Sequence, residues 1–129
     1  MTDSLRAKLV YICKDACPLV LSEDEVDGFP YAVYDMTTTA LSDKDGVYAF
    51  SGDCKIRVVS NDKEEADTAA SSIQSAIASG FRDSSFFNIP GESTKECTNG
   101  IWTIEINYTL KQYADWVEPE EQTTNENSE

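Results

Sequence analysis

Histidine is absent from the 129 residues, and long apolar runs are absent as well. Histidine is the commonest general base near neutral pH and a frequent zinc ligand, so two large classes of site lose their usual residue. No apolar run approaches the roughly 18 residues that a membrane-spanning helix needs. The N-terminus also lacks the apolar centre of a signal peptide. We therefore expect no membrane segment and a protein that is made and assembled in the cytoplasm.

Basic residues are also scarce. The chain has 10 Lys and Arg against 24 Asp and Glu, which gives a formal net charge of -14. Contacts to nucleic-acid phosphates require clustered Lys or Arg, and here these residues are scattered. The composition therefore argues against specific binding of nucleic acid.

The residues that carry catalysis are missing at any recognisable spacing. There is no nucleophile beside a base, no spaced carboxylate pair and no phosphate-binding loop, and the six glycines are isolated. Of the four cysteines only Cys13 and Cys17 are close in sequence, which does not make a zinc site. We expect buried free thiols, no metal, no cofactor and no enzymatic activity.

The stretch from Val47 to Ser60 is the centre of the predicted fold. Its residues alternate, with Tyr48, Phe50 and Cys54 on the apolar side together with Ile56 and Val58. This pattern predicts a long, half-buried strand, with a bulge or bend at Gly52. The preceding turn at 41–46 joins it to a strand predicted over 31–38 as an antiparallel pair.

One helix is predicted before this pair of strands in the sequence, and another after it. The first begins at Asp3 or Ser4 and ends before Pro18, with an apolar stripe that includes Leu5 and Leu9. The second follows the central strand directly, is capped by Ser60, Asn61 or Asp62 and stops at Gly80. After the first helix, residues 19–28 are rich in acids, which indicates a loop or a short extended piece on the surface.

The last strand is predicted over 101–113, where apolar and polar residues alternate without a break. The segment 81–100 before it mixes aromatics with turn formers, and we expect an irregular excursion that contains at most a short strand at 86–89. The predicted fold class is α/β in the α+β sense. It is a mixed, mainly antiparallel sheet of about four strands with two helices against it, in the order α-β-β-α-β.

Length and composition fit one domain over 1–114 followed by an acidic, disordered tail over 115–129. Six acids and no basic residue lie from Asp115 onward. Such a composition cannot bury enough apolar surface to order itself.

This order of elements resembles the tail-completion, or tail-terminator, proteins of tailed bacteriophages, which join the head to the tail. The matching positions are Pro30-Tyr31-Ala32-Val33-Tyr34, the strand from Gly46 to Ser60, the helix from Glu65-Ala66 to Ile77, and the strand from Trp102 to Leu110. The resemblance implies a structural virion protein of the tail or neck. Its partners would be copies of itself in a ring, with a hexamer implied and a dodecamer as the alternative, and other tail and neck proteins.

Two sets of residues are candidates for such a role. Exposed aromatics outside regular elements are enriched at interfaces, which selects Phe29, Phe86, Phe87 and Trp116 as oligomer or partner contacts. Acids that face a DNA channel would keep DNA from adhering, which selects Asp43, Asp45 and Asp53. The acids could equally serve only to keep the protein in solution. The alternative function is an acidic protein-binding module or an inhibitor that mimics DNA.

Overall fold

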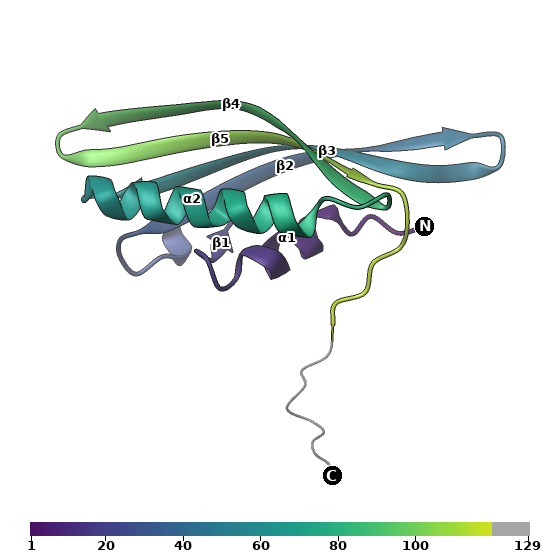
Figure 1. The fold of residues 1–129 in the computed structure, drawn as a ribbon, viewed down its shortest axis with the longest axis horizontal. Coiled ribbons are helices and arrows are strands. Elements are labelled where there is room, and N and C mark those ends of the chain that lie inside the picture. The colour runs from purple at the N-terminus through teal and green to yellow at the C-terminus, as the bar shows by residue number, and fades with distance from the viewer. Residues whose placement is uncertain (120–129) are drawn as a thin grey trace, which may run out of the picture.

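The computed structural model describes residues 1–119 and arranges them in two layers (Figure 1). One layer is a sheet of the strands β1 (Leu19–Val20), β2 (Tyr31–Asp43), β3 (Gly46–Ser60), β4 (Phe86–Thr98) and β5 (Ile101–Gln112). The other consists of the helices α1 (Leu5–Cys13) and α2 (Lys63–Gly80) on one face of the sheet, with a short 3-10 turn, η1 (Glu23–Glu25), between β1 and β2. The predicted α+β class is confirmed.

The sheet contains five strands in the order β1-β2-β3-β5-β4, where about four were expected. The strands missing from the predicted order are the two-residue β1, which pairs parallel with β2, and β4. All other neighbours are antiparallel. Residues 120–129, which include most of the predicted tail, lie outside the described residues.

The central position of β3 is confirmed. Cys54, Ile56 and Val58 are buried under the helices, and their partners on both neighbouring strands are buried too. The predicted alternation is wrong near the start of the strand, where Tyr48 is 50% exposed and Ala49 is fully buried. A β-bulge lies at this point: Ser42 pairs with Val47 and Leu41 with Ala49, so that Tyr48 is an extra residue and the alternation is interrupted.

Of the bulge or bend expected at Gly52, the bulge does not occur, because β3 keeps a continuous register there with both neighbours. The glycine instead makes room in the core. A Cβ atom at this position would lie 2.9 Å from Met36 Sδ and 3.1 Å from Leu5 Cδ1.

Both helices bury one face on the sheet. The Asp62 side chain caps α2 by accepting a hydrogen bond from the Glu65 amide at 3.1 Å, as the sequence predicted. The small residues Ala66, Ala69 and Ala70 are buried and let α2 lie close to the strands. In the shorter α1, the buried residues are Leu5, Leu9 and Cys13, and the helix ends well before Pro18. Within residues 1–119, neither helix is long and apolar enough to cross a membrane.

The prediction of an irregular segment over 81–100 is wrong, because β4 is an edge strand of 13 residues. From Ile89 to Thr98 all its side chains are exposed, so no apolar alternation marks it in the sequence. Its hydrogen-bonded pairing with β5 maintains the strand, and a register shift between Pro90 and Ser93 accommodates the proline and glycine.

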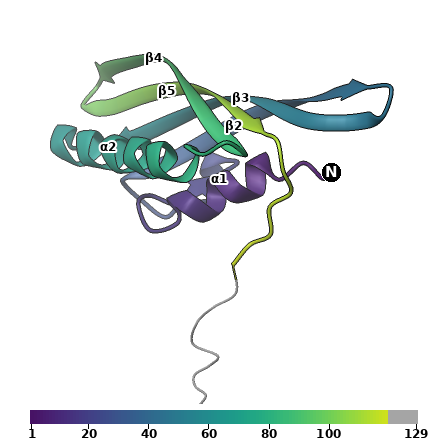
Figure 2. The ribbon, with the colours of Figure 1, turned by 45° about the vertical axis from the view of Figure 1, so that its right-hand side comes forward.

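The hairpin of β2 and β3 extends beyond the rest of the sheet. The last residue of β5, Gln112, lies opposite Phe50, so residues 41–49 project without a third strand beside them (Figures 1 and 2). We call these residues the arm. Its turn is shorter than the predicted 41–46 and consists of Lys44 and Asp45, followed by Gly46 at φ +113°.

Candidate functional site

The face of the sheet opposite the helices has no covering layer in the described part of the chain (Figure 1). We call it the outer face. It carries polar side chains in register: Lys55 lies directly between Asp35 on β2 and Asn107 on β5. The Lys55 Nζ atom is 4.0 Å from Glu105 Oε1, at the limit of an ion pair. Such exposed pairs add little stability.

A groove of about 550 Å³ crosses the outer face next to the bulge in β4. Asp53 lies in it, and its Oδ1 atom accepts a hydrogen bond from Thr109 Oγ1 at 3.3 Å. The Asn107 amide donates to the Glu92 carbonyl at 3.0 Å and holds the bulge in place. Other residues that line the groove are Asp35, Lys55, Ile89 and Pro90.

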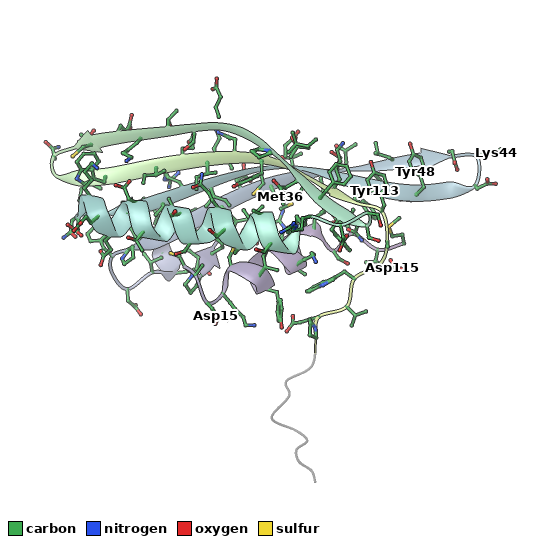
Figure 3. The ribbon with its side chains drawn as sticks, in the orientation of Figure 1. Asp15, Met36, Lys44, Tyr48, Tyr113 and Asp115 are labelled. Carbon is green, nitrogen blue, oxygen red and sulfur yellow. The ribbon has the colours of Figure 1, made fainter. Side chains whose placement is uncertain are left out.

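The arm carries the other two acids that were predicted to face a channel. Asp43 and Asp45 flank its tip, and the Asp43 carboxylate accepts a hydrogen bond from the Asp45 amide at 2.8 Å. Asp53 stands apart from them on the outer face, so the structure does not gather the three acids in one place. Lys44 at the tip and Tyr48 along the arm are both exposed (Figure 3).

The four predicted contact aromatics have different environments. Phe29 is 43% exposed and stacks on Tyr31, with ring centroids 5.8 Å apart. Phe87 is half-buried and stacks on the exposed Tyr113 at 5.7 Å. Both rings are accessible to a partner.

The other two aromatics pack within the monomer. Phe86 is only 4% exposed and meets Phe81 edge to face at 6.1 Å, so it belongs to the core. Trp116 is half-buried, and its ring centroid lies 5.8 Å from that of Tyr11 on α1. This position ties the segment after β5 to α1.

The acidic segment before β2 is more than a solvated loop. Glu23 Oε2 accepts hydrogen bonds from the Tyr31 hydroxyl at 2.6 Å and from Arg57 Nη2 at 3.4 Å. The Tyr31 hydrogen bond, with a smaller effect of Arg57, lowers the pKa of Glu23. No local sequence pattern marks this cluster, since Arg57 is 34 residues from Glu23.

The cysteines do not form a reactive or metal-binding group. Burial raises the pKa of both Cys13 and Cys54 to about 12, whereas Cys97 is exposed on β4. Over residues 1–119, no three Cys, Asp or Glu side chains lie close enough together to hold a metal ion.

Comparison with known proteins gives a likeness of fold. No family model and no curated protein matches the sequence. Among solved structures, the chain is similar to one described as the virion of a native gene transfer agent (GTA) particle. The two are 14% identical, the match covers 82% of this chain and 84% of that one, and the TM-score is 0.53. The chain thus shares its two-layer α+β fold, over most of its length, with a chain of that particle.

Proposed function

We propose that this chain is a structural component of a phage or phage-like virion and carries no enzymatic activity. The observation that carries the proposal is the likeness of fold to a chain of a gene transfer agent virion, which extends over more than four fifths of both chains. Within that role, the chain forms a ring at the head–tail interface or the tail end, where it joins the tail tube to the connector.

The surfaces of the monomer support an assembly role. The outer face, the arm and the ring of Phe29 remain uncovered in a single copy, and the ring of Phe87 is only half-buried. Exposed apolar side chains on the arm, Val47 and Tyr48, are typical of a surface that a partner covers. In an assembled ring these parts contact neighbouring copies or adjoining tail and neck proteins.

Acids on exposed positions fit a channel that DNA passes through. Asp43, Asp45 and Asp53 are all exposed, and a negative lumen would keep DNA from adhering. Replacing all three by lysine tests this part of the proposal. We expect particles with the triple substitution to assemble but to eject DNA more slowly, and an unchanged ejection rate would contradict the lumen assignment.

The assembly itself is tested by the solution mass of the purified protein from light scattering, followed by negative-stain images. We expect rings with a central hole, either free or formed when purified tail tubes are added. A chain that stays monomeric and does not bind to tail tubes or connectors would contradict the proposed function. Capture of a basic protein by that monomer would then favour an acidic binding module.

A further inference from the structure

The outer edge of β2 is only partly covered by the chain itself. β1 pairs with Ala32 and Val33 alone. Farther along, the Arg6 guanidinium on α1 donates a hydrogen bond to the Met36 carbonyl at 3.0 Å, and its carbon lies 5.7 Å from the centre of the Tyr34 ring. Beyond Met36, no other strand of the described residues pairs with this side of β2. The free edge therefore begins at Thr37.

Residues 37–41 of this free edge, before Ser42 and the charged Asp43 at its end, have no feature that discourages pairing. Thr37, Thr38, Thr39, Ala40 and Leu41 contain no charge, proline or glycine, and β-branched threonine favours extended structure. Thr37, Thr39 and Ala40 are exposed. A strand edge of this composition is a template for another strand, because its backbone N–H and C=O groups lack partners.

The opposite edge of the sheet is protected in the usual ways. On β4, Pro90 removes a donor, the register shifts between Pro90 and Ser93, and Glu92, Lys95 and Glu96 place charges along the strand. The sheet thus has one protected edge and one unprotected edge. Pairing between β2 of one copy and β4 of another is therefore opposed by the proline, the register shift and the charges of β4.

We propose that residues 37–41 of β2 pair antiparallel with the same segment of a second copy of this chain, with Thr39 opposite Thr39 on a two-fold axis. This arrangement satisfies the unprotected edge of both copies in one contact. It also closes on itself, because an isologous interface leaves no free edge for a third copy. Closure explains how an uncharged edge can persist without unlimited growth of the sheet.

The two-fold contact goes beyond the ring proposed above and does not depend on it. A ring requires a head-to-tail contact between neighbours, whereas this contact joins two copies of opposite orientation. If both occur, two rings face each other. If only this one occurs, the protein is a dimer.

Cross-linking tests the contact directly. In a Cys97→Ser background, where the remaining cysteines are buried, we expect Thr39→Cys to form a disulfide-linked dimer on mild oxidation. The matched control is Thr94→Cys, which places a thiol on the protected edge strand and should remain monomeric on denaturing gels. Absence of the Thr39→Cys dimer, or equal cross-linking of both variants, would overturn the proposal.

A second variant separates the contact from ring formation. Thr39→Lys sets like charges opposite each other across the two-fold axis, so the solution mass should fall to half while the far-UV circular dichroism spectrum of the folded chain stays the same. Thr94→Lys should leave the mass unchanged. If images of the protein show no rings but Thr39→Cys still cross-links, only the proposed ring is refuted. If the protein forms fibrous aggregates in place of a closed dimer, the two-fold contact is refuted.

Discussion

Ser4 and Gln112 are 108 residues apart in the sequence, and the Ser4 amide donates a 2.8 Å hydrogen bond to Gln112 Oε1. The Nε2 amide nitrogen of Gln112 donates hydrogen bonds to the carbonyls of Thr2 at 2.8 Å and Ala114 at 3.0 Å. Gln112 is fully buried. One amide therefore satisfies three backbone groups and joins the start of α1 to the end of β5.

Replacing this amide with an apolar side chain of similar size should be costly. In Gln112→Leu, the buried Ser4 amide and the two part-buried carbonyls lose their partner, and we expect a loss of about 2–4 kcal/mol in the free energy of unfolding. Urea titration followed by circular dichroism measures it. Gln74→Leu on the half-buried side of α2 is the control, with an expected change below about 0.5 kcal/mol. Equal effects of the two substitutions would contradict a special role for Gln112.

Gly52 provides a test of packing between α1 and the sheet. Gly52→Ala brings a Cβ atom within 2.9 Å of Met36 Sδ, and the resulting overpacking should cost about 1–3 kcal/mol. Gly28→Ala adds the same atom where nothing lies within 4 Å and should change stability by less than about 1 kcal/mol. Thermal unfolding of both variants makes the comparison. A Gly52→Ala variant as stable as the parent would show that Met36 yields freely.

Lys8 on α1 places its ammonium group among aromatic rings, at 4.5 Å from the centre of Phe86, 5.4 Å from Phe81 and 5.7 Å from Trp116. Burial lowers the pKa of Lys8, and the attraction of Asp83 offsets only part of this effect. The charge is therefore poorly accommodated.

We accordingly expect Lys8→Met to retain the parent's stability within about 1 kcal/mol, because the thioether packs on aromatic rings without a charge to desolvate. Lys8→Ala also removes the aliphatic stem and should be less stable than Lys8→Met. Guanidinium titrations of the two variants side by side give the answer. If Lys8→Met is as damaging as Lys8→Ala, the cation–π contacts outweigh desolvation.

The burial of three of the four thiols leads to two measurable predictions. In the native state only Cys97 should react with a thiol reagent at pH 8, and all four cysteines should react in denaturant. Because the pKa of Cys54 rises from an ordinary value of 9.0 to about 12, the folded state holds its proton more tightly than the unfolded state. The resulting stability is complete below about pH 9 and is lost as the pH rises towards 12. Rapid labelling of Cys54 in the native state at pH 8 would contradict its burial.

The parts of the fold that the sequence predicted are those with one buried and one exposed face. β5 alternates from Ile104 to Leu110, and α2 repeats small apolar residues on one side, so each sequence pattern indicates which side chains are buried. β4 was missed because both its faces are exposed from Ile89 onward, and its pairing with β5 leaves no trace in its side chains. The interruption of the alternation at Tyr48 comes from a bulge that an alternating pattern cannot reveal.

The predicted site residues show the same division. Exposed aromatics were sought outside regular elements, which found Phe29 but also selected Phe86, whose burial depends on Phe81. The predicted strand over 31–38 contains only the first two residues of the free edge at 37–41, because the sequence does not indicate that β2 continues to Asp43 or that β1 pairs with only two of its residues. Hydrogen bonds between distant residues, such as those of Gln112, have no local signature at all.

The hydrogen bond between the Thr2 amide and Asp115 Oδ1, 3.0 Å long, brings the two ends of the folded region together. A short peptide that joined residue 115 to residue 2 would therefore span little distance, and new ends could be opened at Asn99–Gly100, the exposed turn between β4 and β5. Such a circular permutant would carry a fluorescent or affinity label at the opposite end of the sheet from the arm. Copies labelled in this way would mark that end in images of any assembly while leaving the arm and the β2 edge unobstructed.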